Sequence, residues 1–383
     1  MSSTHVMQCD YFDAHRCRSC SLMGTTYADQ LAAKLERSAL ALGHVAPELE
    51  WSSPFSSQPQ GFRNKAKLVV GGMRGQPTVG ILDRDGRGVD LRDCGLYEPG
   101  LDTVVRRVPA LITELGLVPY DVARRTGELK HVLLTHSPAG ELMMRFVLRS
   151  PGQLGRIRRH LRDLLDSVPQ LRVVSVNLQP AHAAVLEGAD ETVLTEQVEL
   201  PMQVNDVRLR LRTRSFFQTN TAVAAGLYRQ AREWIDECDP ASLVDLYCGV
   251  GGFALHTSVR PDGSPRSVLG VEVSGEAVDS ARAAAAEMGV DARFEVGDAS
   301  LHLLQGRPPD LVVVNPPRRG IGPELAHRLD RSSVPHVLYS SCNVDSLAYD
   351  LQQMPSLVPT RGRLFDMFPQ TGHMELLTLL ARR

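Results

Sequence analysis

A cysteine within a short polar run is the first residue of this sequence that could do chemistry. Cys342 stands in Tyr339-Ser340-Ser341-Cys342-Asn343, at the end of an apolar stretch that predicts a β-strand. A cysteine taken alone is more often a small buried hydrophobe, but the serines and the asparagine favour a reactive thiol here. An unperturbed thiol is only slightly ionised at pH 7, so a nucleophilic Cys342 needs activation by its surroundings.

A candidate general base lies near the carboxyl terminus. The segment Phe368-Pro-Gln-Thr-Gly-His373-Met-Glu375 leads into a final apolar stretch, 376–380, which predicts a strand. Glu375 opens this strand, and a carboxylate there is a suitable proton acceptor. His373 is the rival candidate. Without Cys342 elsewhere in the chain, Glu375 would be taken for an ordinary surface carboxylate.

A glycine-rich turn predicts a nucleotide-like cofactor. Asp245-Leu-Tyr-Cys-Gly-Val-Gly-Gly-Phe253 runs out of a predicted strand, and its glycines permit a tight turn and close backbone approach. The next strand ends at Glu272, whose carboxylate can bind both hydroxyls of a ribose. Because the G-x-G-x-x-G spacing of pyrophosphate sites is not met, a phosphate-free cofactor fits better, and S-adenosyl-L-methionine is the common one. Asp298, after a third short strand, either contacts the adenine or is an ordinary turn residue.

A rigid turn, Asn315-Pro-Pro-Arg318, ends the fourth predicted strand and places Asn315 at the ligand edge of the sheet. Amino-group methyltransferases carry an aromatic residue after such a turn, and Arg318 stands there instead, which argues against methylation of an exocyclic amine. A thiol nucleophile suits C5 of uracil. Thiolate addition at C6 makes C5 nucleophilic, C5 takes the methyl group, and a base then removes the C5 proton so that the thiolate can leave.

An alternating α/β pattern from about residue 240 onward must position these residues. An alanine-rich helix is predicted over 277–288, and a further helix over 27–42. The fold class is therefore α/β, with a doubly wound, Rossmann-like parallel sheet that binds ligands at the carboxyl ends of its strands. The predicted strands are Leu243–Leu246, Val268–Val271, Leu311–Val314 and His336–Tyr339.

Composition and charge exclude several classes of protein. The chain of 383 residues has a net charge of -2, with 43% hydrophobic and 22% charged residues, which is ordinary for a globular protein of two or three domains. Bulk charge gives no sign of nucleic-acid binding, so any RNA contact must come from local patches. No apolar run is long enough to cross a bilayer and no signal core begins the chain, so we expect a cytoplasmic protein.

One charge pattern leaves two interpretations open. Strict alternation over 207–214 predicts a strand with Arg208, Arg210, Arg212 and Arg214 on one face. Like charges so close repel one another unless an anion or carboxylates lie opposite. The strand face is therefore either solvated or directed at RNA.

Four of the seven cysteines lie early in the chain, at Cys9, Cys17, Cys20 and Cys94. Cytoplasmic thiols stay reduced, so such a group points to metal binding or catalysis rather than to disulfides. The spacing alone fits zinc as well as an iron-sulfur cluster.

Five segments, present together and in order, resemble the RNA uracil-5 methyltransferase family. They are Ser215-Phe-Phe-Gln218-Thr-Asn220, Asp245-Leu-Tyr-Cys-Gly-Val-Gly251, Asn315-Pro-Pro-Arg-Arg-Gly320, Ser341-Cys342-Asn343 and Asp366-Met-Phe-Pro-Gln-Thr-Gly-His-Met-Glu375. The resemblance implies Cys342 as the nucleophile and Glu375 as the base. Many members have Asp at the Asn315 position and Phe at the Tyr247 position, which we interpret as subgroup differences. The cofactor contacts that the resemblance implies are Gln218, Tyr247, Glu272 and Asn315.

The ribosomal branch of the family, which this chain is most similar to, implies a [4Fe-4S] cluster held by Cys9, Cys17, Cys20 and Cys94. It implies 23S ribosomal RNA as the partner, with uracil 747 as the target. We also expect a monomer. We expect three parts: an iron-sulfur segment over 1–95, a central α+β RNA-binding domain over 96–205, and a methyltransferase domain over 206–383. The alternatives are a non-catalytic iron-sulfur RNA-binding factor, or an enzyme for another rRNA or tRNA uridine. The presence of both Cys342 and Glu375 favours an enzyme.

Overall fold

The computed structural model describes residues 6–299 and 308–383, which fall into two compact units. The first unit comprises residues 6–7, 21–58 and the described part of 203–383, and the second comprises 8–20 and 59–202. These limits differ from the expected boundaries at 95 and 205, since 21–58 pack with the carboxyl-terminal half. No helix in the described ranges is long and apolar enough to cross a membrane.

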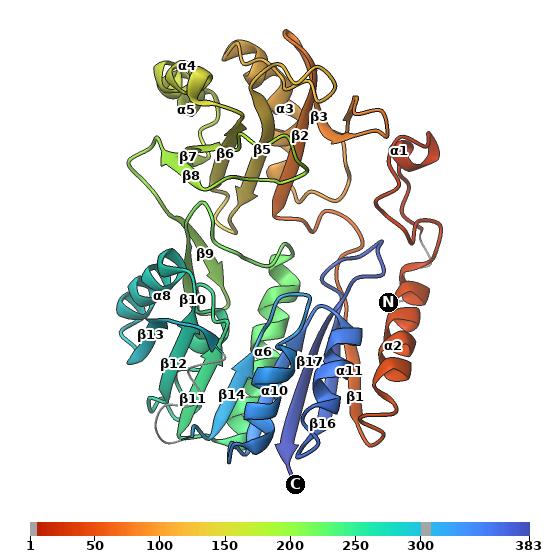
Figure 1. Ribbon diagram of the computed structural model, residues 1–383, viewed down its shortest axis with the longest axis vertical. Coiled ribbons are helices and arrows are strands. Elements are labelled where there is room, and N and C mark those ends of the chain that lie inside the picture. Colours follow the sequence, from red (N-terminus) through yellow and green to blue (C-terminus); the bar gives the residue numbers. More distant parts are fainter. Residues whose placement is uncertain (1–5, 300–307) are drawn as a thin grey trace. The chain divides into compact units, whose positions relative to one another are not determined.

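Among the described residues, the first unit is built on an eight-stranded sheet in the order β1-β16-β17-β15-β14-β11-β12-β13 (Figure 1). Strands β13, β12, β11, β14 and β15 are parallel neighbours, as the sequence predicts, whereas β17 is antiparallel to both β15 and β16. The sheet is therefore mixed rather than wholly parallel. Its strands are β1 (Glu50–Phe55), β11 (Ser242–Leu246), β12 (Ser267–Glu272), β13 (Ala292–Val296), β14 (Leu311–Val314), β15 (His336–Ser341), β16 (Leu357–Phe365) and β17 (Glu375–Arg382).

Helices cover this sheet and build its core. Apolar side chains of α2, α10 and α11 join those of β14, β15 and β17 in one buried cluster. Helix α6 packs against β15, β16 and β17, and α8 packs against β12 and β13. The helices of the unit are α2 (Tyr27–Leu42), α6 (Thr221–Cys238), α7 (Gly252–His256), α8 (Gly275–Met288), α10 (Gly322–Arg331) and α11 (Val344–Gln352).

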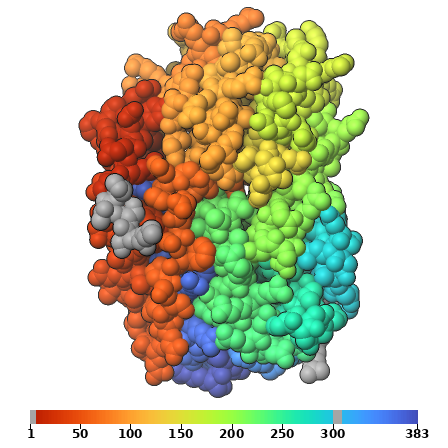
Figure 2. All heavy atoms as spheres, turned by 180° about the vertical axis from the view of Figure 1, so that it is seen from behind, coloured from red at the N-terminus to blue at the C-terminus, as the bar shows by residue number. Residues whose placement is uncertain are grey.

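Two contacts explain why residues 21–58 belong to the carboxyl-terminal half. Helix α2 packs against α11, and its buried Lys34 pairs with Asp366 at 2.6 Å. Strand β1 then extends the sheet as a parallel neighbour of β16, with Glu50 opposite Arg361. In the space-filling view, the orange-red surface of this early segment lies against the blue surface of the carboxyl-terminal residues (Figure 2).

The second unit is a seven-stranded sheet in the order β4-β3-β2-β5-β6-β7-β8, within the described residues. All neighbours are antiparallel except β6 and β7. Helices α3, α4 and α5 pack their apolar residues onto this sheet in a second core. The bounds are α1 (Asp10–Asp13), β2 (Lys65–Met73), β3 (Gln76–Leu82), β4 (Gly88–Asp90), α3 (Leu101–Glu114), β5 (Leu129–His136), β6 (Leu142–Leu148), η1 (Pro151–Gln153), α4 (Leu154–Arg159), α5 (Leu161–Ser167), β7 (Leu171–Leu178) and β8 (Asp190–Val193).

A hairpin of β9 (Leu200–Val204) and β10 (Val207–Leu211) carries the alternating arginines. Arg208 and Arg210 both pair with Glu287 of α8, at 3.1 and 2.8 Å, and Arg212 lies 4.0 Å from Asp279. Carboxylates therefore lie opposite these arginines. Because ion pairing already relieves the repulsion, the RNA-directed interpretation of this strand face loses its main support.

Candidate active site

Cys342 follows β15 directly and precedes the amino end of α11, so it lies at the carboxyl edge of the sheet. The pKa of the thiol is raised by burial and then by the nearby charge of Glu375, and Arg318 lowers it. The partial positive charge at the amino end of a helix also favours a thiolate. Arg318 and the end of α11 therefore oppose the effects of burial and of Glu375, although the pKa of the thiol stays above its ordinary value.

Asn343 caps α11 and fixes the loop that carries the thiol. Its Oδ1 accepts the Asp345 N–H at 3.1 Å, and its Nδ2 donates to the Arg318 carbonyl oxygen at 3.1 Å. The Ser341 hydroxyl donates to the Asn343 carbonyl oxygen at 2.9 Å. These bonds tie the nucleophile loop to the turn that follows β14, so Arg318 is held beside Cys342.

The carboxylate of Asp350 holds that turn in place through hydrogen bonds. Its buried carboxylate accepts the N–H groups of Ile321 at 2.9 Å and Gly322 at 3.2 Å, and the Tyr339 hydroxyl at 2.6 Å. Gly320 has a φ of +81°, and a Cβ there would lie 2.2 Å from an Asp350 oxygen. A glycine is therefore required at this point, both for the backbone conformation and for the close approach of the carboxylate.

Glu375 opens β17 and is only 2% exposed. Because Ser341 pairs with Leu376 in the β15–β17 ladder, Glu375 lies next to Cys342 just beyond the last pair. The Ser340 hydroxyl donates to Glu375 Oε1 at 2.5 Å. Burial raises the pKa of the Glu375 carboxyl to about 7, and the Ser340 hydrogen bond opposes this shift. A pKa near the working pH suits a group that must accept a proton and later release it.

A pocket of about 200 Å³ opens beside the thiol, within the first unit. This volume is below that of sites for drug-sized ligands and suits a single flat base. Arg37 of α2 and Arg318 bring positive charge to it, and burial and Arg318 lower the pKa of His373. Glu375 is not among the lining residues, whereas its rival His373 is. The lining residues are Arg37, Arg318, Cys342, Asn343, Val344, Gly372, His373 and Met374.

The expected cofactor residues lie at the ends of neighbouring strands. Glu272 ends β12, Tyr247 follows β11 and Asn315 follows β14, and these strands are adjacent in the sheet. The Gly249 N–H donates to Glu272 at 3.2 Å, which fixes the acid at the glycine turn. Tyr247 has a φ of +64°, which non-glycine residues rarely adopt and which surrounding structure must hold. Gln218 is buried and precedes α6, which packs against α7.

Asp245 is a buried acid to which the sequence analysis gave no role. Its Oδ2 accepts the Ala254 N–H at 3.0 Å, and its Oδ1 has no hydrogen-bond partner within the described residues. Burial raises the pKa of this carboxyl to about 8. An unpaired carboxyl oxygen beneath the glycine turn fits a site that receives the polar groups of a cofactor.

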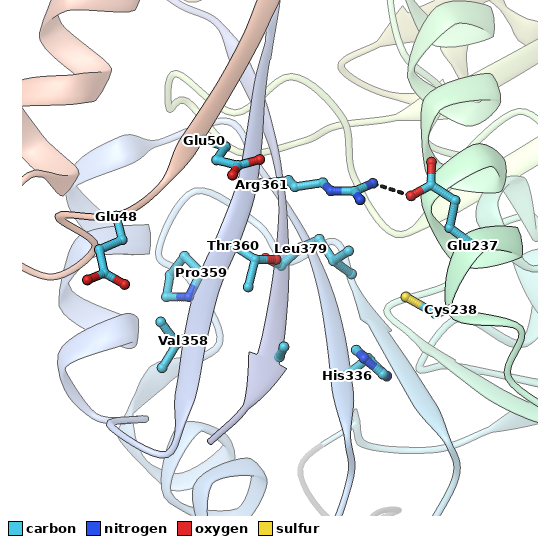
Figure 3. A pocket seen from close by; sticks show the side chains of 11 residues that line it. Glu48, Glu50, Glu237, Cys238, His336, Val358, Pro359, Thr360, Arg361 and Leu379 are labelled. Atoms are coloured by element: carbon cyan, nitrogen blue, oxygen red, sulfur yellow. Dashed lines mark hydrogen bonds and ion pairs between the residues drawn. The ribbon is translucent and has the colours of Figure 1, made fainter.

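A second pocket, of about 620 Å³, lies elsewhere in the same unit (Figure 3). Its lining includes His336, the first residue of β15, and an ion pair between Arg361 and Glu237. Cys342 follows the other end of β15, and a strand of this length spans roughly 20 Å. This pocket is therefore separate from the candidate active site.

The four early cysteines all fall within the second unit. In the described ranges, no three His, Cys, Asp or Glu side chains are arranged to hold a metal ion. Burial and the charges of Cys94, Cys17 and Cys9 nevertheless raise the pKa of Cys20 to about 11, so the thiols are neighbours. Arg63 lowers this pKa, and its buried Nε has no hydrogen-bond partner among the described residues. The structure thus groups the thiols without showing the expected cluster site.

The sequence predicts Cys342 and Glu375 as the reactive pair, but it gave Ser340, Arg318 and Asp350 no role in supporting either of them. Ser340 had a usable signal, because it stands two residues before Cys342 and so shares its face of the strand. Arg318 was noted only as evidence against amine methylation. Nothing in the local sequence marks Asp350, whose partners lie up to 29 residues away.

Comparison with known proteins identifies the family of this chain. The tRNA (uracil-5-)-methyltransferase family model matches residues 182–294 and 304–383. The 23S rRNA (uracil(747)-C(5))-methyltransferases RlmC of two Escherichia coli strains, E24377A and 55989, are 45% identical over 380 residues, which is 98% of this chain and 100% of theirs. The structure of the Pyrococcus abyssi tRNA (uracil-54, C5)-methyltransferase with S-adenosyl-L-homocysteine has the same fold, with a TM-score of 0.78, 24% identity, and coverage of 94% of this chain and 85% of that one. This chain therefore belongs to the RNA (uracil-5-)-methyltransferase family of S-adenosylmethionine-dependent enzymes.

Proposed function

We propose that this protein methylates C5 of uracil 747 in 23S ribosomal RNA. Near-full-length similarity to enzymes named for that reaction supports the substrate. The single observation that carries the chemistry is the placement of Cys342 next to the buried Glu375, at the edge where the cofactor strands end. Methylation of a different rRNA or tRNA uridine by the same site is the alternative.

S-adenosyl-L-methionine supplies the methyl group when it is bound. The unpaired oxygen of Asp245 and the glycine turn held by Glu272 fit such a ligand. The residues proposed to hold it are Gln218, Tyr247, Glu272 and Asn315.

Cys342 and Glu375 act in sequence in the proposed reaction. The Cys342 thiolate, favoured by Arg318, forms a bond from Sγ to C6 of the uracil. The ring then carries negative charge that makes C5 the nucleophile toward the methyl carbon. Glu375 takes the proton from C5, and the bond between Sγ and C6 breaks as the ring regains its double bond.

Separate variants test the two steps. Cys342→Ala should abolish methylation of 23S rRNA while cofactor binding, measured by calorimetry, persists. Glu375→Gln should still add to C6 and transfer the methyl group, but it cannot remove the C5 proton. It should therefore remain joined to methylated RNA and migrate as a heavier, denaturant-resistant species on a gel. The double variant is the control and should form no such species.

Two results would contradict this assignment. Methylation by Cys342→Ala would exclude the covalent mechanism. Normal turnover by Glu375→Gln, combined with trapping in His373→Asn, would transfer the role of base to His373, which lines the pocket.

We also propose that Cys9, Cys17, Cys20 and Cys94 bind a [4Fe-4S] cluster. The support is a set of four neighbouring thiols with the buried, unpaired Nε of Arg63 beside them, which suits an anionic group. Binding would require the thiols to close around the metal, since the described residues show no metal-binding arrangement. The methyl transfer needs no electrons, so the proposed cluster serves structure or RNA placement.

RNA binding is proposed for the central part of the chain, 96–205, and for the cationic pocket rim of Arg37 and Arg318. A phosphate near the target base would find both guanidinium groups within one site. We further propose a cytoplasmic monomer, since ribosomal RNA of bacteria such as the E. coli relatives is modified in the cytoplasm.

A further inference from the structure

We infer that Ser340 is a positioning residue whose hydroxyl holds the Glu375 carboxylate beside Cys342 and in its ionised form. This inference rests on the proposed role of Glu375 as the base. Ser340 does not touch the substrate in this scheme. It acts through Glu375 and only on the second half of the reaction.

The geometry of the β15–β17 ladder supports this role. Ser340 pairs with Leu377 across the two antiparallel strands. Alternate residues of a strand share a face, so Ser340 and Cys342 lie on the same face as Leu377 and Glu375. The Ser340 Oγ to Glu375 Oε1 distance is 2.5 Å, and both side chains are buried, at 0% and 2% exposed. Water therefore cannot reach this site to replace the hydrogen bond.

The surroundings of Glu375 make this bond important. Two titratable groups interact with Glu375. One is the buried Tyr228 of α6, whose pKa is raised by burial and by the charges of Asp245 and Glu375, and the other is the Cys342 thiol. Neither is a cation. Among the described residues, the Ser340 hydroxyl is the only hydrogen-bond donor to Glu375, and it opposes the effect of burial on the pKa of the carboxyl. Loss of the hydroxyl should leave the carboxyl protonated over a wider range of pH.

The chemical consequence is confined to one step. Addition of the Cys342 thiolate and methyl transfer do not use a base at Glu375. Removal of the C5 proton does, and only the ionised carboxylate can accept it. A weakened base should therefore slow release of the RNA from Cys342 without slowing formation of the adduct.

Single-turnover measurements across pH 5.5–9.5 test the inference with Ser340→Ala, Ser340→Thr and Ser340→Cys. Adduct formation and adduct breakdown are followed separately by denaturing gels. The rate of adduct breakdown should fall at low pH, where Glu375 is protonated, and this fall is called the acid limb. In Ser340→Ala the acid limb should move up by about one pH unit, because losing a hydrogen bond to a charged group shifts its pKa by about that much. Below the limb, breakdown should be about tenfold slower, with recovery toward the wild-type rate at high pH. Ser340→Cys, a weak donor of similar size, should move the same way, and Ser340→Thr should restore the wild-type limb.

Ser258→Ala is the matched control, since the buried Ser258 hydroxyl donates to the Leu255 carbonyl oxygen and does not contact Glu375. Its pH limb should stay at the wild-type position. An unshifted limb in both Ser340→Ala and Ser340→Cys would overturn the inference, and so would equal slowing at every pH, which a merely structural role predicts. If Glu375→Gln traps the adduct while the Ser340 variants are unshifted, only the role of Ser340 fails. If Glu375→Gln turns over normally, the base assignment fails and this inference with it.

Discussion

Single residues of the active site couple stability to pH through burial. The pKa of Glu375 is about 7 in the folded protein, above the usual value of about 4.3 in an unfolded chain. The folded state therefore favours the protonated carboxyl. The stability that this preference adds to the fold is fully present below the unfolded pKa and is lost as pH rises through 7. Glu375→Gln removes the cost of the buried charge, so it should stabilise the protein at pH 8 relative to pH 5 by an amount on the order of 3 kcal/mol. Urea unfolding at the two pH values measures this, and an equal difference at both would contradict it.

Residue types in a short run were enough to predict Cys342 and Glu375 as candidate reactive groups, but not the neighbours that shift their pKa values. Cys342 stood out because polar neighbours surround it at the end of a strand, and Glu375 because it begins one. The hydrogen bond from Ser340 crosses between strands 35 residues apart. Local sequence could not predict it, because the pairing of β15 with β17 is set by the whole sheet. The position of Arg318 near the thiol likewise depends on the turn that Asp350 holds in place.

At the scale of elements, two sets of arginines should behave differently toward RNA. Arg208 and Arg210 already pair with Glu287 of α8, so replacing Arg208, Arg210 and Arg212 together by Gln should leave the salt dependence of RNA binding unchanged. Arg37, which α2 brings to the pocket, pairs with Asp345 at 3.1 Å, but both side chains are more than half exposed, so an RNA phosphate can replace that weak pair and Arg37 should behave as a phosphate contact. Arg37→Gln should raise KM for RNA and lower the slope of log affinity against log salt by about one.

Binding titrations at several salt concentrations would separate these outcomes. A flatter slope in the β10 variant, with no effect of Arg37→Gln, would reverse the assignment. Surface ion pairs are worth at most about 1 kcal/mol, so the β10 variant should fold normally and serve as a control that removes three positive charges away from the pocket, against the one that Arg37→Gln removes.

The bounds of the helices and strands were largely predictable from the sequence, but the elements that each one packs against were not. The helix over 27–42 and the strand over 311–314 have the predicted bounds, because apolar spacing determines them locally. The antiparallel direction of β17 carries no such signal. Nor does the addition of residues 50–55 to the methyltransferase sheet, which depends on the buried pair of Lys34 and Asp366 and on the neighbouring strand β16.

At the scale of the molecule, the division into units changes what the early cysteines can do. The expected boundary at residue 95 joins residues 21–58 to the cysteines. In the structure, those residues complete the methyltransferase unit, while 8–20 belong with 59–202. The four thiols thus come from one short segment and one loop of a single unit. A cluster bound there would tie residues 8–20 to that unit without passing through the active site.

Whether the proposed cluster holds residues 8–20 against the rest of the second unit can be tested. Protein purified without oxygen should contain iron and acid-labile sulfide, and Ser at Cys9, Cys17, Cys20 or Cys94 should remove both. A short segment with little regular structure needs a metal or disulfide to stay ordered, so the same variants, or chelation of the iron, should make residues 8–20 sensitive to limited proteolysis. Cys238→Ser, in the other unit, is the matched control and should keep its iron. Cofactor binding should survive in all variants, because the residues proposed to hold the cofactor, Gln218, Tyr247, Glu272 and Asn315, lie in the first unit. Protein that contains zinc and no sulfide would exclude the iron-sulfur assignment. Unchanged proteolysis of residues 8–20 after loss of iron would show that the cluster does not hold this segment in place.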